Sequence, residues 1–207
     1  RKVIGIVDLE RGNIGSVKNA VEFLGEIPIV LDSPSGIDEC DGIILPGVGS
    51  FFNSMTEMKR RGFDAALREY AAGGGRILGI CLGMQLLASF GTENGDIEGV
   101  ALIPGRVRRM NVPNDLRLPH VGWNGVERTR VHPLFHGVKE GVDFYFTHSY
   151  VFEVENEEHA LGKTLYGERF TSVVAVGNVW GVQFHPEKSQ KSGLRLLRNF
   201  LEEETEA

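Results

Sequence analysis

Residues 79–87, "GICLGMQLL", place a cysteine between two glycines where an apolar strand passes into an apolar helix. The segment before it, residues 76–80, is typical of a strand buried on both faces, and residues 81–90 predict the helix. Small neighbours permit the strained turn that presents a nucleophile at such a corner. The helix N-terminus favours a thiolate at Cys81. The corner therefore predicts an α/β fold with a nucleophilic cysteine; a small buried cysteine that only packs is the alternative.

The chain before this corner alternates strand and helix patterns. Strands are predicted at residues 2–9, 27–32 and 41–49, and helices at residues 12–26 and 63–75. Asn13 is the expected N-cap of the first helix and Gly25 its expected stop. Short connections between alternating strands and helices favour a mostly parallel, open central sheet flanked by helices, with ligands at the carboxyl ends of the strands.

The second half is richer in short β segments separated by turn residues. We expect strands at residues 124–130, 143–155, 171–180 and 181–184, and a closing amphipathic helix at residues 192–204. These strands are predicted to be antiparallel additions to the central sheet. Because neither a repeat nor a linker divides the chain, residues 1–207 are expected to form a single domain.

Composition limits the classes of partner and the compartment. The formal net charge is -6, from 22 basic and 28 acidic residues, which gives no basic surface for nucleic acid or an anionic membrane. No apolar run is long enough to span a bilayer. Cys40 and Cys81 are expected to be free thiols in the cytoplasm. The histidines have no metal-ligand spacing, so neither a metal nor another cofactor is expected.

A second motif, "FHPEKS" at residues 184–189, supplies partners for the cysteine. His185 follows a predicted buried strand, and Glu187 lies two residues further on, so that both side chains can face the same side. His185 can then act as base and acid for Cys81, while Glu187 orients its ring. The alternative is a histidine that caps a strand, followed by a solvated carboxylate.

The third motif, "LPGVGS" at residues 45–50, is a glycine-bearing loop after a buried strand. The amide of Val48 or Gly49, with that of Leu82, is expected to form an oxyanion hole. An ordinary turn between a strand and a helix is the alternative for this loop. "RGN" at residues 11–13 matches no phosphate-binding pattern.

In this order and spacing, "GICLGMQLL", "LPGVGSF" and "FHPEKS" resemble the class I, triad-type glutamine amidotransferases, a flavodoxin-like family, over essentially the whole chain. Three further stretches, "GNIGSVKNA" (residues 12–20), "LPHVGWN" (118–124) and "FYFTHSY" (144–150), resemble the glutaminase subunits of imidazole glycerol phosphate synthase. The resemblance implies a Cys81, His185 and Glu187 triad that hydrolyses glutamine to glutamate and ammonia.

The same resemblance implies further site residues. Those expected to hold glutamine are Gly49, Gln85, Glu93, His148, Ser149 and Tyr150. Those expected to meet a partner subunit are Asn13, Trp123, Asn124, Tyr145 and Lys188. Without the resemblance, these positions would be interpreted as helix surface, loop charges and packed aromatic residues. Arg11 and Ser16 depart from the commoner pattern of the family.

The implied partner is a (β/α)8-barrel cyclase, which would form a heterodimer with this chain. It would receive the ammonia and make imidazole glycerol phosphate and aminoimidazole carboxamide ribotide in histidine biosynthesis. Ammonia released into water would be protonated and lost as a nucleophile, so the active site is expected to lie at the interface. The isolated chain is then expected to be a poor glutaminase, because the cyclase with its ligand biases the loop at residues 46–49.

Other functions stay open at the level of sequence. The chain could serve another synthase, such as those making anthranilate, carbamoyl phosphate, GMP or pyridoxal phosphate, although "LPHVGWN" favours the histidine pathway. A cysteine-dependent protease or chaperone-like domain, a γ-glutamyl hydrolase that needs no partner, and a non-catalytic binding subunit are further alternatives. Glu187 and Gln85 favour the amidotransferase over these.

Overall fold

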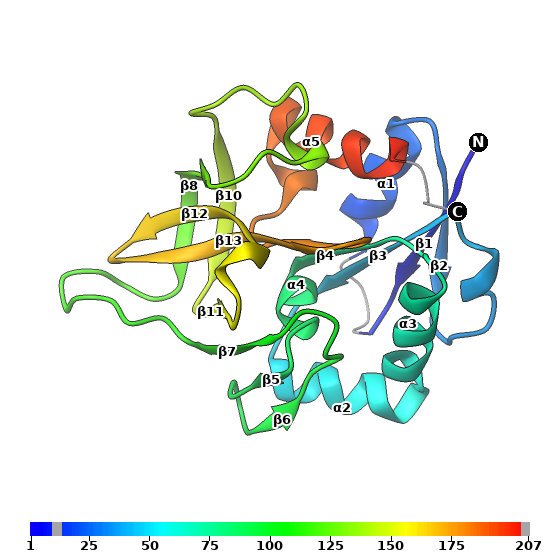
Figure 1. The fold of residues 1–207 in the computed structure, drawn as a ribbon, viewed down its shortest axis with the longest axis horizontal. Helices are drawn as coiled ribbons and strands as arrows, with labels where there is room; N and C mark the ends of the chain where they lie inside the picture. The colour runs from blue at the N-terminus through cyan, green and yellow to red at the C-terminus, as the bar shows by residue number, and fades with distance from the viewer. Residues whose placement is uncertain (10–13, 204–207) are drawn as a thin grey trace.

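The main sheet is the centre of the computed structural model, which describes residues 1–9 and 14–203 (Figure 1). Within these residues it has eight strands, in the spatial order β2 (Ile27–Leu31), β1 (Val3–Val7), β3 (Gly42–Gly47), β4 (Ile77–Cys81), β14 (Val179–Val182), β13 (Glu168–Val176), β12 (Ala160–Tyr166) and β9 (Glu127–Arg128). The strands from β2 to β14 are parallel, and β13, β12 and β9 continue the sheet in antiparallel pairings. The predicted fold class is confirmed.

Helices cover both faces of this sheet (Figure 1). Their bounds are α1 (Gly15–Phe23), α2 (Phe51–Arg61), α3 (Phe63–Ala72), α4 (Leu82–Leu86) and α5 (Gln190–Glu202). Single 3-10 turns are η1 (Ile37–Glu39), η2 (Pro133–Phe135), η3 (Glu157–His159) and η4 (Pro186–Lys188). Helices α1 and α5 lie on one face, and α2, α3 and α4 on the other, which leaves the carboxyl ends of the parallel strands free for a site.

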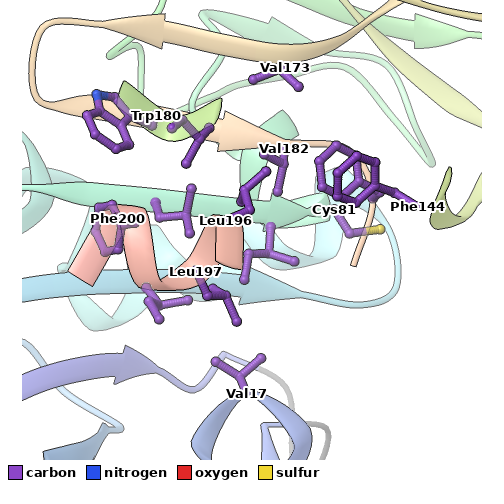
Figure 2. Packing of buried hydrophobic residues seen from close by; sticks show 14 of the residues in the cluster. Val17, Cys81, Phe144, Val173, Trp180, Val182, Leu196, Leu197 and Phe200 are labelled. Carbon is purple, nitrogen blue, oxygen red and sulfur yellow. The ribbon is translucent and has the colours of Figure 1, made fainter. Parts of the chain in front are cut away.

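Alternating side chains of the parallel strands fill the two cores. In β3, Ile44 packs toward α1 and α5, whereas Ile43 and Leu45 pack toward α2 and α3. Figure 2 shows Leu196, Leu197 and Phe200 of α5 in the first core, with Cys81 at its edge and its sulfur directed away from the aliphatic side chains. Each fully buried apolar side chain contributes about 1.5–3 kcal/mol to folding. Cys81 is thus held by packed structure on its inner side.

Local signals set most of the helix ends. Helix α1 has Ile14 as its N-cap and stops before Gly25, which has the expected positive φ of 89°. The predicted N-cap, Asn13, lies outside the described residues. Helix α2 was not predicted; Ser50 caps it by accepting a hydrogen bond from the amide of Asn53, at 3.2 Å. The closing helix is confirmed, although it starts at Gln190, two residues earlier than expected.

The helix after Cys81 is shorter than predicted. The expected helix over residues 81–90 ends at Leu86, and Phe90 and Gly91 instead form the short strand β5. The carbonyl groups of Leu86 and Leu87 accept hydrogen bonds from amides of the returning segment, Val100 at 2.8 Å and Leu102 at 2.9 Å. Since these carbonyls are satisfied by a distant segment, a further helical turn is not needed.

Part of the second half leaves the main sheet, contrary to expectation. The predicted strand at residues 143–155 breaks at Ser149 into β10 (Asp143–His148) and β11 (Tyr150–Val154). Strand β10 pairs with β8 (His120–Gly125), which overlaps the start of the strand predicted at residues 124–130. Strand β11 joins β7 (Gly105–Arg109), β5 (Phe90–Gly91) and β6 (Ile97–Glu98) in another small sheet. Only β9, β12 and β13 are antiparallel additions to the main sheet in the described residues.

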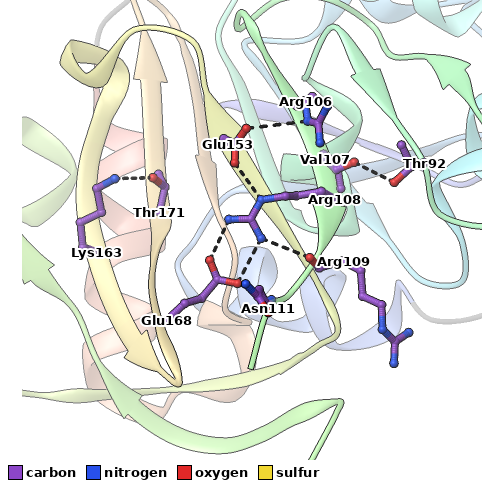
Figure 3. Close-up of polar contacts among 10 residues, drawn as sticks. All are labelled: Thr92, Arg106, Val107, Arg108, Arg109, Asn111, Glu153, Lys163, Glu168 and Thr171. Carbon is purple, nitrogen blue, oxygen red and sulfur yellow. Dashed lines mark hydrogen bonds and ion pairs between the residues drawn. The ribbon is translucent and has the colours of Figure 1, made fainter. Parts of the chain in front are cut away.

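Arg108 links the small sheet around β7 to the main sheet (Figure 3). Its guanidinium donates hydrogen bonds to Glu153 of β11, at 2.7 Å, and to both carboxylate oxygens of Glu168 at the start of β13, at 3.1 and 2.7 Å. Glu168 also accepts a hydrogen bond from the amide of Asn111. Hydrogen bonds and charge from Glu168 raise the pKa of Arg108 despite its partial burial. A bidentate pair of this kind fixes orientation as well as distance.

Among the residues that the structure describes, none of the helices is both long and apolar enough to cross a membrane.

Candidate active site

Cys81 occupies a strained corner between β4 and α4. Its backbone has φ 56° and ψ -115°, which is unusual for a residue with a side chain. The two flanking residues must be glycines, because there is no room for a Cβ atom at either position. A Cβ on Gly83 would lie 1.7 Å from the carbonyl oxygen of Leu45, and one on Gly79 would lie 2.6 Å from that of Gly83. The spacing of glycine, cysteine and glycine therefore reflects close contact of α4 with strand β3, at Gly83, and with strand β4, at Gly79.

His185 and Glu187 form a buried pair at the end of β14. Nδ1 of His185 lies 2.7 Å from Oε1 of Glu187, whose side chain is 4% exposed. His185 also donates its backbone amide to the carbonyl of Tyr145, and the hydroxyl of Ser189 donates to the carbonyl of His185. These bonds hold the backbone of His185 in place, and the contact of Nδ1 with the carboxylate orients the ring. Nε2 is then left for the hydrogen bond with the side chain of Cys81.

The electrostatics favour a protonated His185. Burial lowers the pKa of the ring, but the hydrogen bonds with Cys81 and Glu187, and the charges of both, outweigh burial and raise it to about 10. A thiolate and an imidazolium stabilise each other in such a pair. The arrangement supplies both a nucleophile and a proton for a leaving group.

Replacing Glu187 with glutamine is expected to lower the pKa of His185, because the amide keeps the size of the side chain but removes the charge that favours imidazolium. The folded-state pKa, about 10, lies above the unfolded value of about 6.5. The stabilisation from this group is therefore complete below about pH 6.5 and disappears as the pH rises through about 10. An NMR titration of the His185 ring in both proteins measures the shift.

Glu93→Gln is the matched control for this titration, since Glu93 lines the same cavity and accepts a hydrogen bond from Phe51. It should leave the His185 midpoint close to that of the wild type. Equal midpoints in the wild type and the Glu187→Gln variant would contradict the assigned pair.

One cavity of about 220 Å³ brings most of the predicted site residues together. Its walls include Cys81, His185, Val48, Gly49, Leu82, Gln85, Glu93, His148, Ser149 and Tyr150, all of which were predicted from sequence. Gly47 and Thr147 also line it and were not predicted. Gly47 is paired with Cys81 across β3 and β4, which places the loop at residues 46–49 beside the nucleophile. Glu187 lies behind His185 as its partner.

Two buried glutamines lie close to Cys81: Gln85 lines the cavity, and Gln183 lies behind it. Gln85 donates from Nε2 to the carbonyl of Tyr150 and to Oε1 of Gln183, each at 3.0 Å. Nε2 of Gln183 in turn approaches Sγ of Cys81 at 3.9 Å. Gln183 was missed by sequence analysis, although a glutamine in the apolar strand segment "GVQF" was an available signal. Sγ of Cys81 also lies 3.7 Å from the carbonyl oxygen of Thr147.

Glu93 supplies a carboxylate at the edge of the cavity. Its Oε1 accepts a hydrogen bond from the amide of Phe51 at 3.0 Å, and burial raises the pKa of its carboxyl group. A cationic group entering the cavity would offset the electrostatic cost of burying the charged carboxylate. Glu93 is therefore suited to meet an ammonium group.

Four of the residues predicted to meet a partner lie on β8, β10 and η4, but they do not share one face, because successive strand residues alternate and Asn124 points inward to His120. Trp123 is 50% exposed on β8 and packs edge-on against Tyr145 of β10, with ring centroids 5.9 Å apart. Asn124 is the next residue of β8, and the exposed Lys188 ends η4. Tyr145 contacts the His185 segment by donating its amide to the hydroxyl of Ser189. Asn13, the fifth predicted residue, lies outside the described part of the chain, as does Arg11.

Within the described residues, 1–9 and 14–203, the side chains form no group of three or more histidines, cysteines or carboxylates that could hold a metal ion.

Comparison with known proteins identifies the family. The family model for class I glutamine amidotransferases matches residues 6–203. Imidazole glycerol phosphate synthase subunit HisH of Symbiobacterium thermophilum is 48% identical over 95% of this chain and 92% of that protein. The HisH subunit of Moorella thermoacetica is 46% identical over 95% and 93%. These relatives decide among the synthases that the sequence left open.

Solved structures agree on the fold. PurLQS from Thermotoga maritima has a TM-score of 0.76, covers 97% of this chain and 98% of its own, and is 18% identical. The crystal structure of a glutamine amidotransferase has a TM-score of 0.73 over 96% of this chain and 97% of its own, at 21% identity. The chain belongs to the class I glutamine amidotransferases and, within them, to the family of HisH subunits of imidazole glycerol phosphate synthase.

Proposed function

We propose that this chain hydrolyses glutamine to glutamate and ammonia, and supplies the ammonia to imidazole glycerol phosphate synthase in histidine biosynthesis. One observation carries the proposal: in a member of the HisH family, Cys81 and the His185–Glu187 pair meet at a single cavity. The position of Cys81 at a helix N-terminus and the raised pKa of His185 support a thiolate–imidazolium pair.

The first half of the reaction forms a thioester. The Cys81 thiolate attacks the side-chain carboxamide carbon of glutamine, and the amides of Val48 or Gly49 and of Leu82 stabilise the negative oxygen. His185 then gives its proton to the nitrogen as the carbon–nitrogen bond breaks, so that ammonia leaves and a glutamyl thioester remains. Glu187 stays ionised and holds the ring in place.

The second half returns the enzyme to its starting state. Neutral His185 accepts a proton from water while the oxygen of that water attacks the thioester carbon. The carbon–sulfur bond breaks, the thiolate re-forms beside the imidazolium, and glutamate is released. One glutamine and one water are consumed for each glutamate and ammonia, so no redox cofactor is needed.

The remaining cavity residues are assigned to the amino-acid end of glutamine. Glu93 faces its ammonium group, and Gln85 with the segment of His148, Ser149 and Tyr150 forms the wall beside it. The loop residue Gly49 forms a further part of the wall. These assignments are carried over from the resemblance to the family, and the shared cavity and the chemistry of each group support them.

We assign the partner as a (β/α)8-barrel cyclase that forms a heterodimer with this chain. Support comes from the exposed apolar side chains Val121, Trp123 and Leu165, which are costly to leave in water and suited to an interface; Val121 is paired with Thr147, a residue of the cavity wall. Ammonia must also reach its acceptor before water protonates it. We place the reaction in the cytoplasm, since Cys40 and Cys81 are both free thiols.

The proposal is tested by measuring glutamate release from glutamine with three samples. They are the chain alone, the chain with the cyclase subunit taken from the synthase of a HisH relative, and that complex with the cyclase's ribotide ligand. We expect low turnover alone and at least about a tenfold increase with the liganded cyclase, the size of a typical coupling free energy. Full turnover by the lone chain would instead indicate a free-standing hydrolase. No turnover in any sample would reject the proposed reaction.

A further inference from the structure

Two buried histidines, His120 and His148, connect Asn124 of β8 to the cavity. They are directly paired across β8 and β10, and Nδ1 of His120 lies 2.9 Å from Nε2 of His148. At the inner end, Nδ1 of His148 lies 2.9 Å from the carbonyl oxygen of Tyr150. At the outer end, Nδ2 of Asn124 lies 3.3 Å from Nε2 of His120. The four residues form one continuous chain of hydrogen bonds.

The two ends of this chain fix the direction of every bond in it. Oδ1 of Asn124 accepts from the amide of Gly125 at 2.8 Å, and its Nδ2 donates to the carbonyl of Leu165 at 2.9 Å. The amide nitrogen therefore faces His120 as a donor, and Nε2 of His120 must accept. The carbonyl of Tyr150 can only accept, so Nδ1 of His148 must donate to it. Both rings are then neutral, with the proton on Nδ1.

Burial and packing leave little freedom for another arrangement. His120 is 3% exposed and lies between the rings of Phe146 and Tyr166, with centroid distances of 4.9 and 4.1 Å. Burial lowers the pKa of His120 to about 4 and that of His148 to about 3. An added proton on either ring would place two donors face to face, at Asn124 or between the rings, so geometry and burial favour the same neutral state.

The inner end of the chain acts on the site itself. The Tyr150 carbonyl that accepts from His148 also accepts from Gln85 at 3.0 Å, and all three residues line the cavity. We propose that His120 is a positioning residue for glutamine binding: through His148 it holds the Tyr150 carbonyl, and thereby Gln85, in the geometry that the substrate requires. This inference rests on the proposed function in one respect, that the cavity takes glutamine.

The first test is the kinetics of His120→Phe in the complex with the liganded cyclase. Phenylalanine fits the space between the two rings but leaves His148 without a donor at Nε2. We expect KM for glutamine to rise roughly 5- to 100-fold, the cost of an unsatisfied buried group, with kcat changed less. His120→Gln, whose amide carries both a donor and an acceptor, should recover most of the loss.

His132→Phe is the matched control. His132 is a partly buried histidine that, like His120, contacts an aromatic ring, in this case that of Trp180, edge-on. It accepts a hydrogen bond from the amide of Leu134 but does not line the cavity. A general loss of stability should affect both phenylalanine variants alike. Unchanged KM in His120→Phe, or the same KM increase in both variants, would overturn the proposal.

The second test does not depend on turnover. Nitrogen-15 NMR of the histidine rings should find His120 and His148 of the wild-type chain neutral and protonated at Nδ1, and in His120→Phe the His148 signals should change. A wild-type ring protonated at Nε2 would overturn the assigned direction. If the wild-type complex hydrolyses no glutamine, the proposed function fails, while this measurement still decides the hydrogen-bonded chain.

Discussion

Replacing Cys81 with alanine is expected to lower kcat for glutamine hydrolysis by at least ~10⁴-fold, because no other group can form the thioester. Substrate binding should survive, since Gln85, Glu93 and the backbone of β11 are untouched. The measurement is steady-state glutamate release by the complex with the liganded cyclase, together with glutamine binding by calorimetry. Loss of turnover with retained binding is the expected pair of results.

Cys40→Ala provides the matched control for this experiment. Cys40 is the other free, buried cysteine of the chain, and burial raises the pKa of its thiol, so it is a poor nucleophile. It packs against Gly5, away from the cavity. Turnover by Cys40→Ala should stay near that of the wild type. Turnover retained by Cys81→Ala would remove the nucleophile from the mechanism and leave general acid–base hydrolysis as the remaining explanation.

Replacing Gly83 with alanine is expected to destabilise the fold by more than about 3 kcal/mol, at the upper end of single-residue effects. The added Cβ would lie 1.7 Å from the carbonyl oxygen and 2.7 Å from the carbonyl carbon of Leu45. Both are backbone atoms of a central strand, so the clash can be relieved only by separating α4 from β3. Urea unfolding followed by circular dichroism measures the change in free energy.

Gly15→Ala is the control for backbone effects of the same substitution. Gly15 is the first residue of α1, and a Cβ there has no neighbouring atom within 4 Å. Alanine should be neutral or stabilise the fold by up to about 1 kcal/mol, because it restricts the unfolded chain. If Gly83→Ala unfolded at the same urea concentration as the wild type, the close contact of α4 with β3 would be wrong.

Local sequence accounts for the parts of the site that depend on neighbouring residues. The corner around Cys81 could be predicted because its glycines lie two residues away on either side. The pairing of His185 with Glu187 was also predicted, but for the wrong reason: strand alternation was assumed, whereas β14 ends at Val182 and the 3-10 turn η4 brings the two side chains together. The parallel sheet followed from continuous apolar strands, whose burial on both faces needs helices on both sides. These features depend on short-range spacing that the sequence displays directly.

Contacts between distant segments could not be predicted in this way. The end of α4 depends on amides of residues 100 and 102, and the bond between Gln85 and Gln183 joins positions far apart in the chain. His120 resembles any histidine in a β segment until its pairing with His148 is known. The break at Ser149, which sends β10 and β11 into different sheets, has no turn signal of its own in "FTHSYVF".

That break has a mechanical consequence for catalysis. Cys81 belongs to the main sheet, whereas Thr147 and His148 belong to the β8–β10 pair, so the cavity lies where two differently paired sheets meet. A displacement of one sheet against the other by a fraction of an ångström would change every distance between them at once, while each sheet keeps its own strand pairing intact. The precision of the site therefore depends on what joins the two sheets: the core that Phe144 and Phe146 share with the main sheet, and the backbone hydrogen bond from His185 to Tyr145.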